Sequence, residues 1–276
     1  MPQSIRTREA IRMLDITNVT KTFNARTINE RIALNDICLH LDDRDFVTVI
    51  GGNGAGKSTL LNAIAGVWPV ECGRITVDGT DITGMPEHRR AAFLGRVFQD
   101  PMMGTAATMQ IEENLALAAR RGQNRTLKAG ITREERGRYK EQLAMLGLGL
   151  EDRLTARVGL LSGGQRQALT LLMATLKKPK LLLLDEHTAA LDPRTAAKVL
   201  EITERIVSEN KLMTLMVTHN MRDAIRYGNR LIMMNEGRII LDISGEEKKQ
   251  LTIERLMDAF AKASGDTFVN DRALLS

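Results

Sequence analysis

The segment that most constrains the fold is a glycine-rich stretch between an apolar strand and a helical run. Residues 51–58, GGNGAGKS, fit the pattern G-x-x-x-x-G-K-[S/T] and follow the apolar run FVTVI. Glycines let a backbone curl around an anion with its N–H groups turned inward, and the N-terminus of the following helix adds a favourable dipole. The chain is therefore expected to contain a strand–loop–helix unit that binds nucleotide phosphates.

Eight residues of this segment are expected to contact the nucleotide: Gly51, Asn53, Gly54, Ala55, Gly56, Lys57, Ser58 and Thr59. The ammonium group of Lys57 would neutralise the β- and γ-phosphates, and the hydroxyl group of Ser58 would bind Mg²⁺. A glycine-rich turn without a ligand is the alternative. The strand before the loop and the helix after it favour phosphate binding.

Two further motifs follow in the second half of the chain. LSGGQ occupies residues 161–165, and an apolar strand LLLL ends in the acidic pair Asp185 and Glu186. At such a strand end, Asp185 can hold Mg²⁺ through water and Glu186 can polarise an attacking water. Alone, a strand that ends in Asp-Glu is a weak signal, because acidic residues are common in loops.

These three motifs, in this order, resemble the nucleotide-binding subunits of ATP-binding cassette (ABC) transporters, from residue 13 to about residue 243. Other positions match the family pattern. Gln99, after LGRVF, matches the glutamine that senses the γ-phosphate site beside the membrane partner, and His219 matches the switch histidine. Phe23 matches the aromatic residue that stacks on adenine; a place in the core is its alternative. AALD ends at Asp192 and matches a loop at the dimer contact.

The resemblance implies ATP hydrolysis with ATP and Mg²⁺ as cofactors. The catalytic residues that it implies are Glu186, His219 and Gln99. The implied Mg²⁺ ligands are Ser58, Gln99 and Asp185. Family members form head-to-tail dimers, in which the LSGGQ motif of one copy covers the ATP of the other. The residues that would contribute across that interface are Ser162, Gly163, Gly164, Gln165 and Asp192.

Ser162 and Asp192 also have a local interpretation that is compatible with the first. Both are residue types that cap helix N-termini, and Pro193 suits the first helical position. The chain departs from the family at His187, where many members have proline. A titratable group near the γ-phosphate and a substitution tolerated in a loop are both compatible with this histidine. The variant looks like that of ATPases paired with bacterial importers of small organic solutes, including amino-acid-like ones.

Composition limits the location and partners. No apolar run approaches the ~20 residues that span a bilayer, the N-terminal residues lack a signal-peptide stretch, and Cys38 and Cys72 have no metal or redox spacing. These features predict a protein of the reducing cytoplasm that reaches a membrane only through a partner. The resemblance implies a peripheral location at the cytoplasmic face of the cell membrane, with a second copy, transmembrane permease subunits and an extracytoplasmic solute-binding protein as partners. Met102 and Met103 either fill the core or line an adaptable groove that receives a short helix of the permease.

A basic stretch keeps a second function open. Residues 120–141 contain eight Lys or Arg and three Asp or Glu. A nucleic-acid-associated ABC ATPase could use such a surface, and a solvated helical face is the plainer interpretation. Tyr139 is the one aromatic residue there that could stack on bases, and no sustained heptads separate the first motif from LSGGQ. No nucleic acid partner is therefore expected.

The hydrophobic patterning predicts an α/β core with a helical insertion in its middle. The resemblance implies, in more detail, a P-loop NTPase core with a mixed sheet, an N-terminal antiparallel β-subdomain and an inserted helical subdomain. The core is expected at 11–99 and 177–245, the helical signature subdomain at 100–176 and a C-terminal helical tail at 246–276. GRITVDG followed by TDITG predicts a hairpin. In the tail, Thr252 should cap a helix whose apolar stripe docks on the core: Ile253, Leu256, Met257 and Phe260.

Overall fold

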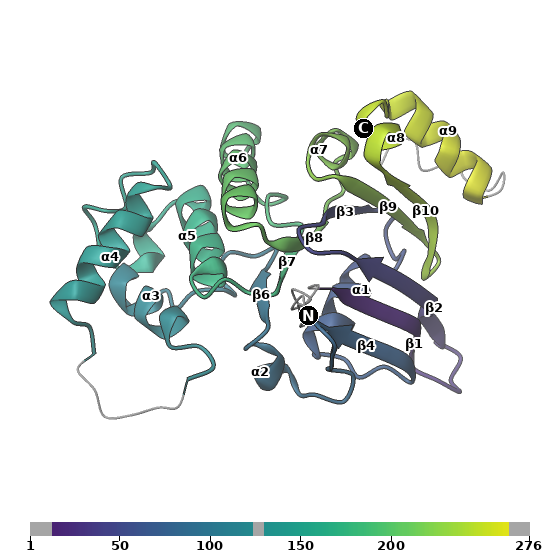
Figure 1. Cartoon of the computed structure of the whole chain (residues 1–276), viewed down its shortest axis with the longest axis horizontal. Helices are drawn as coiled ribbons and strands as arrows, with labels where there is room; N and C mark the ends of the chain where they lie inside the picture. Colours follow the sequence, from purple (N-terminus) through teal and green to yellow (C-terminus); the bar gives the residue numbers. More distant parts are fainter. Residues whose placement is uncertain (1–12, 124–129, 265–276) are drawn as a thin grey trace, which may run out of the picture.

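The computed structural model describes residues 13–123 and 130–264, and in this part the chain forms two sheets and a set of helices (Figure 1). One sheet has four antiparallel strands in the order β2-β1-β4-β5, and the other has six strands in the order β10-β9-β3-β8-β7-β6. The second sheet is mixed, because β10 is antiparallel to β9 while the other neighbours are parallel. The predicted α/β class with an antiparallel subdomain is confirmed.

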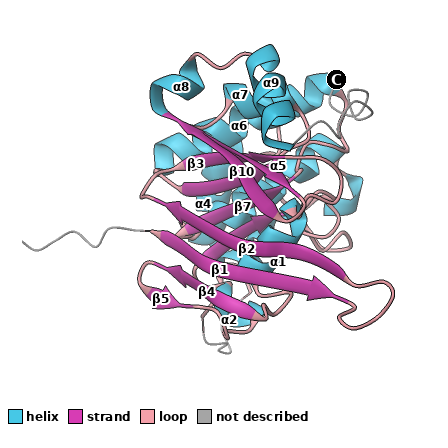
Figure 2. Cartoon of the chain, turned by 90° about the vertical axis from the view of Figure 1, so that its right-hand side faces the viewer, coloured by secondary structure: helices cyan, strands magenta, loops and turns pink. Residues whose placement is uncertain are grey.

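The antiparallel sheet consists of β1 (Leu14–Phe23), β2 (Arg31–Leu41), β4 (Cys72–Val77) and β5 (Thr80–Asp81). Alternating residues such as Leu14 and Ile16 are buried, and they join one core cluster with α1 (Lys57–Ala65). Val77 pairs with Thr80 across the turn between β4 and β5, so the predicted hairpin is present. In Figure 2 these strands run across the near side of the molecule.

The six-stranded sheet consists of β3 (Phe46–Ile50), β6 (Leu94–Val97), β7 (Leu181–Asp185), β8 (Met213–Val217), β9 (Arg230–Asn235) and β10 (Arg238–Ser244). Its central strands β3, β7 and β8 are mostly apolar and almost fully buried, as expected for parallel strands that are covered on both faces. In the register, Val49 pairs with Val217, and Val217 pairs with Asp185. The carboxyl ends of β3, β7 and β8 therefore lie at one edge of the sheet.

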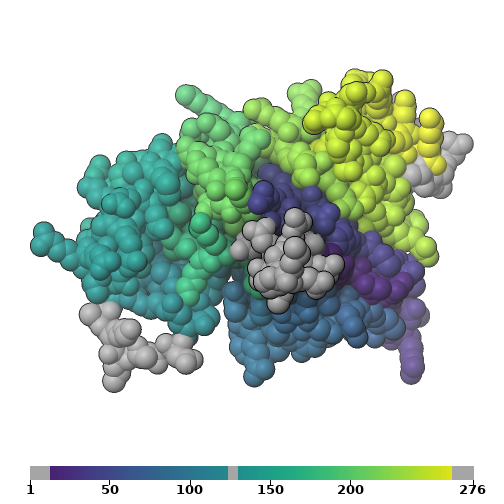
Figure 3. Space-filling view, viewed as in Figure 1, coloured from purple at the N-terminus to yellow at the C-terminus, as the bar shows by residue number. Residues whose placement is uncertain are grey.

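Helices beyond the β6 edge of this sheet form a lobe of their own at the left of Figures 1 and 3. The lobe contains α3 (Ile111–Ala119), α4 (Arg133–Ala144), a short 3-10 turn (Val158–Leu160) and α5 (Gly163–Thr175). The remaining helices are α2 (Glu87–Arg90), α6 (Pro193–Asn210), α7 (Met221–Arg226), α8 (Gly245–Lys249) and α9 (Ile253–Ser264). The sequence analysis did not predict the short helices α2 and α7, whereas α8 lies in the predicted helical tail.

The basic stretch is partly tied into this lobe. Arg136 of α4 binds Glu112 of α3 through two hydrogen bonds of 2.6 and 2.7 Å, and Arg120 contacts Glu135 at 3.2 Å. Residues 124–129 of the stretch lie outside the described residues. Because these described arginines pair with carboxylates of their own lobe, they favour the interpretation of a solvated helical face.

A buried arginine closes the C-terminal end of α1. The Arg90 residue is 2% exposed, and its guanidinium group donates to the carbonyl oxygens of Ala63 and Ile64 at 2.7 and 2.8 Å. It also donates to the carbonyl oxygens of Met85 and Thr83, both at 2.7 Å. Carbonyl groups in the last turn of a helix lack partners within the helix and carry partial negative charge, so a cation there is favourable. Arg90 thus fixes the far end of the helix that begins at the glycine-rich loop.

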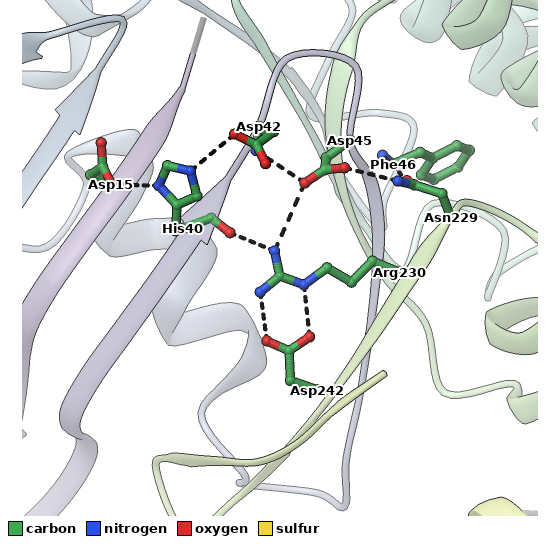
Figure 4. Close-up of polar contacts among 8 residues, drawn as sticks. All are labelled: Asp15, His40, Asp42, Asp45, Phe46, Asn229, Arg230 and Asp242. Carbon is green, nitrogen blue, oxygen red and sulfur yellow. Dashed lines mark hydrogen bonds and ion pairs between the residues drawn. The ribbon is translucent and has the colours of Figure 1, made fainter. Parts of the chain in front are cut away.

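A polar network joins the two sheets near the start of β3, at the end of that strand opposite to the glycine-rich loop (Figure 4). Arg230 of β9 donates to both carboxylate oxygens of Asp242 at 2.7 and 2.5 Å and to the carbonyl oxygen of His40 at 2.6 Å. The His40 ring contacts Asp15 at 2.6 Å and Asp42 at 3.1 Å. The hydrogen bond with Asp15 raises the pKa of His40, as does the one with Asp42, whereas partial burial lowers it. The network ties β2 to the β9–β10 edge.

The tail packs as predicted. The Oγ1 atom of Thr252 accepts a hydrogen bond from the Arg255 backbone at 3.3 Å, and Leu256 and Phe260 are buried against Met221 and other residues of α7 and β9. The tail prediction reached residue 276, and residues 265–276 lie outside the described part. Within the described residues no helix is both long and apolar enough to cross a membrane.

Candidate active site

The site lies where the carboxyl ends of β3, β7 and β8 meet. The glycine-rich loop follows Ile50, Glu186 follows Asp185, and His219 lies two residues beyond the end of β8. In open α/β sheets, ligands bind outside the carboxyl ends of the strands. The topology therefore brings the first and third motifs together, although more than a hundred residues of sequence separate them, and places His219 beside them.

The loop is held in a shape that requires glycine. Gly54 and Gly56 have φ angles of 79° and 103°, and a Cβ atom on Gly56 would lie 2.5 Å from the carbonyl oxygen of Ala33. Gly56 is the N-cap of α1, and no side chain caps this end of the helix. The first N–H groups of α1 are thus open to a phosphate group, as the motif predicts.

Lys57 is buried at the base of the loop. The residue is 7% exposed, and its ammonium group donates to the carbonyl oxygens of Gly51 and Gly52 at 2.8 and 3.1 Å. Burial lowers the pKa of Lys57, while the carboxylates of Glu186 and Asp185 act against that shift. A cation that is desolvated in this way and held by neutral carbonyls is well placed to bind phosphate oxygens.

Asp185 connects the loop to β6. Its Oδ1 atom accepts a hydrogen bond from the Ser58 hydroxyl at 3.3 Å, and its Oδ2 atom lies 3.7 Å from the guanidinium of Arg96. Burial raises the pKa of Asp185, and Arg96 counters this rise. Arg96 also donates to Asn62 of α1 at 2.7 Å. The oxygens of Ser58 and Asp185, side by side next to a phosphate loop, are the donors that a hard divalent cation prefers.

Glu186 lies beside His219, with 3.5 Å between its Oε2 atom and the Nδ1 atom of the histidine. Its side chain is 20% exposed, whereas that of His219 is 57% exposed. Glu186 has a φ angle of 41°, which is uncommon for a residue with a side chain. Such strain often marks functional sites. The structure brings these two residues together, and their roles as base and switch residue, which the resemblance implies, stay predictions.

A cavity of about 230 Å³ opens above the loop. The predicted residues that line it are Phe23, Asn53, Gly54, Ala55, Gly56, Lys57, Ser58, Thr59 and Glu186. Arg31 and Ala33 of β2 also line it, and the sequence analysis missed both. The Arg31 guanidinium donates to the carbonyl oxygen of Gly54 at 2.6 Å. No local signal marks these residues, because they reach the loop through the pairing of β2 with β1.

Phe23 is at the mouth of this cavity, and its ring packs edge-on against Trp68 with 4.9 Å between centroids. Trp68 was also missed. It is the single tryptophan of a chain with few aromatic residues, and it lies three positions after the end of α1. These two features were the only sequence signals that could have marked it as a site residue. Phe23 lines the cavity, and its stacking on a base stays a prediction.

The LSGGQ motif does not line this cavity. Ser162 is the N-cap of α5 and accepts from the Gln165 backbone at 3.3 Å, while the Gln165 side chain accepts from the Ser162 backbone at 3.2 Å. A Cβ atom on Gly164 would lie 2.1 Å from the Cγ2 atom of Thr195, so packing of α5 on α6 already requires this glycine. A Cβ atom on Gly163 would meet only Leu191, at 3.2 Å. The motif is thus locally well ordered but apart from the nucleotide cavity of its own chain.

Gln99 and Asp192 also lie outside the nucleotide cavity. Gln99 lines a neighbouring groove of about 660 Å³ together with Asp185, Arg96 and Met103. Asp192 caps α6 and accepts from the Thr195 backbone at 3.1 Å, as its local interpretation predicts. Met102 and Met103 are 47% and 69% exposed, so core filling is the wrong interpretation of this pair.

The position of His187 rules out one of its two interpretations. It lies in the loop after β7, as expected, but it is 2% exposed and does not line the nucleotide cavity. Burial lowers the pKa of His187 to about 4. The idea of a titratable group facing the γ-phosphate is therefore corrected: the imidazole is neutral near pH 7 and turns toward α6.

Comparisons with known proteins agree with this geometry. Residues 34–189 match the family model described as "ABC transporter". The chain is 44% identical over 251 residues to a tyrosine transport ATP-binding protein of Clostridioides difficile, which covers 91% of this chain and 100% of the relative. It is 32% identical over 228 residues to an Fe(3+) ions import ATP-binding protein of Streptomyces coelicolor, of which it spans 60%.

A solved structure shares the fold. The dimeric post-hydrolysis state of an ATP-binding cassette bound to ADP and Pi matches with a TM-score of 0.72 at 28% identity, over 84% of this chain and 98% of the other. The family match covers more than half of the chain, and the phosphate loop, the acidic pair and His219 meet at one edge of the sheet. The chain belongs to the ABC transporter family and is an ATP-binding subunit whose ATP hydrolysis is coupled to transport.

Proposed function

We propose that this chain drives a bacterial importer of a small, amino-acid-like solute. The observation that carries this proposal is the 44% identity to a tyrosine transport ATP-binding protein over that protein's whole length. The name of the Streptomyces relative, an import protein, supports the direction of transport. The solute itself would be selected by permease subunits and by an extracytoplasmic solute-binding protein, with this chain at the cytoplasmic face of the membrane.

The transport experiment follows from the nucleotide site. Uptake of radiolabelled L-tyrosine is measured in cells that lack the gene and carry either the wild-type chain or the Lys57→Ala variant. The proposal predicts uptake with the wild type and none above the deletion background with the variant. Equal uptake with both, or normal tyrosine uptake in the deletion strain, would contradict the proposed solute class.

Within the site, we assign roles by position. Lys57 and the open amides of α1 bind the phosphates, and Phe23 stacks on the base. A Mg²⁺ ion bound with the nucleotide would be held by Ser58 and Asp185, with Gln99 beside them, and would neutralise phosphate charge. Glu186 accepts a proton from the attacking water. His219, whose Nδ1 atom lies 3.5 Å from the Oε2 atom of Glu186, contacts the γ-phosphate.

We propose that the working unit is a head-to-tail pair of these chains. The supporting observation is that the LSGGQ residues do not line the nucleotide cavity of their own chain, while the uncapped α1 terminus leaves that cavity open. A second copy would present the N-terminus of its α5, with Ser162, Gly163 and Gly164, to the γ-phosphate. Gln165 would act through the cap that it forms with Ser162, and Asp192 would lie at the contact between copies.

Mixing two inactive variants tests this arrangement. Gly163→Asp places a negative charge where phosphate would bind in trans, yet an acidic residue at a helix start is compatible with the fold. Lys57→Ala removes the phosphate cation in cis. In a mixed head-to-tail pair, one composite site has both parts intact, so the mixture should recover ATPase activity that neither variant has alone. Failure of the mixture to recover activity, with both variants folded, would contradict the arrangement.

The groove beside Gln99 is where we propose that the permease docks. It is lined by Gln99 and by the exposed Met103, and Asp185 of the hydrolysis site lies at the same groove. The buried Gln167 side chain of α5 donates to the Phe98 carbonyl oxygen at 3.1 Å, which links the LSGGQ helix to this segment. We propose that the helical part, 100–176, moves as a unit against the core, 11–99 and 177–245, when the permease moves; the tail, 246–276, follows the core.

A further inference from the structure

His187 is joined to a helix that carries another part of the site. Its Nε2 atom lies 3.1 Å from the Oγ1 atom of Thr203 on α6, and Thr203 is fully buried. The Thr203 hydroxyl donates its single proton to the carbonyl oxygen of Val199 at 2.8 Å. The hydroxyl therefore accepts the second hydrogen bond, and the Nε2–H group of His187 donates it.

Glu186, the residue before His187, has a backbone conformation that neighbouring contacts must stabilise. Glu186 has a φ angle of 41°, a left-handed backbone conformation that is unfavourable for a residue with a side chain and persists only where surrounding contacts fix it. Two backbone hydrogen bonds help to fix this conformation. The Glu186 N–H group donates to the Val217 carbonyl oxygen at 3.0 Å, and the Ala189 N–H group donates to the Glu186 carbonyl oxygen at 2.9 Å. Neither of them fixes the loop to α6.

The contact between His187 and Thr203 provides that attachment. The loop between β7 and α6 ends at Asp192, which caps the first turn of α6, and His187 binds the same helix 11 residues further along, at Thr203. The loop is thus fastened to α6 at both of its ends. Because α6 also packs against the LSGGQ helix at Gly164 and Thr195, one helix sets the position of both the loop and that motif.

We propose that His187 is a positioning residue, which holds the backbone of Glu186 through its hydrogen bond to Thr203 and so directs the carboxylate toward the attacking water. This rests on the proposed role of Glu186 as the base. In family members with proline at this position, a fixed φ angle would stiffen the loop; here a hydrogen bond to the neighbouring helix does so. The role needs the hydroxyl group of Thr203, not only its volume.

A matched pair of variants separates positioning from packing. Thr203→Val keeps the shape of the side chain and removes the acceptor, whereas Thr203→Ser keeps the hydroxyl and removes a methyl group. A small displacement of a catalytic group is costly, so Thr203→Val should lower kcat for ATP roughly ten-fold with KM changed less than about two-fold. Thr203→Ser should retain most of the wild-type kcat. If both variants behave alike, the hydroxyl has no special role and the proposal is wrong.

A second variant guards against a folding artefact. His187→Met removes the donor and fills a similar volume, and its kcat should fall as far as that of Thr203→Val. The double variant should lose no more than either single one, because both remove the same interaction. Additive losses would overturn the proposal. Stoichiometric binding of a fluorescent ATP analogue by each variant shows that the loss is not one of folded protein.

Glu186→Gln is measured in parallel to keep the two proposals apart. If Glu186→Gln is inactive while Thr203→Val equals the wild type, the base stands and the positioning role fails. If Glu186→Gln hydrolyses ATP normally, the proposed base itself is wrong.

Discussion

Removing the guanidinium group of Arg90 should unfold the molecule more easily and disturb the phosphate loop from a distance. Arg90 donates to four carbonyl oxygens, two of them in the last turn of α1. A net hydrogen bond contributes roughly 1 kcal/mol, and more when one partner is charged, so Arg90→Met should cost about 4 kcal/mol. That is a large share of the roughly 5–15 kcal/mol by which domains are stable.

The assay is urea unfolding followed by far-UV circular dichroism, with ATP binding measured on the folded protein. Arg89→Met is the matched control, because Arg89 is the exposed neighbour on the same short helix. Exposed substitutions usually change the free energy of unfolding by less than about 0.5 kcal/mol. We also expect weaker ATP binding by Arg90→Met, since α1 begins at the loop. Equal unfolding free energies for the two variants would refute the reasoning.

Three further outcomes follow from single contacts. Lys57→Ala should abolish ATP binding, as measured by calorimetry, because the cation that binds the phosphates is gone. The pKa of His40 is raised in the folded state, so its contribution to stability is present below its unfolded pKa and is lost as pH rises through its folded pKa. Over that pH range the urea midpoint of the wild type should fall relative to that of His40→Gln. Parallel pH profiles of the two urea midpoints would contradict this. Gly164→Ala should destabilise by about 1–3 kcal/mol through its clash with Thr195, while Gly163→Ala should be tolerated better; unfolding by urea compares them, and equal stability would contradict the packing.

Much of the local structure could be predicted from the sequence. The strands before the phosphate loop and before Glu186 are continuous apolar runs, and the caps at Ser162, Asp192 and Thr252 are visible because each depends on a residue and its near neighbours. The motif residues of the loop were identified in the same way, since the glycine pattern is itself the binding geometry.

The parts that were missed depend on contacts between distant segments. Arg31 reaches the carbonyl oxygen of Gly54 only once β2 has paired with β1, and Trp68 packs against Phe23 only after β1 is placed. The short helices α2 and α7 have too few turns to show a hydrophobic period. The burial of His187 depends on the packing of α6, which no local pattern records.

Glu186→Gln, compared with the wild type, shows whether Glu186 hydrolyses ATP within an ATP-closed pair of chains. ATP turnover and sedimentation velocity are measured on both purified proteins, with and without Mg-ATP. We expect turnover and a mostly monomeric state for the wild type, and no turnover with a stable ATP-dependent dimer for Glu186→Gln. Wild-type turnover by Glu186→Gln, or a variant that stays monomeric while it binds ATP, would contradict it.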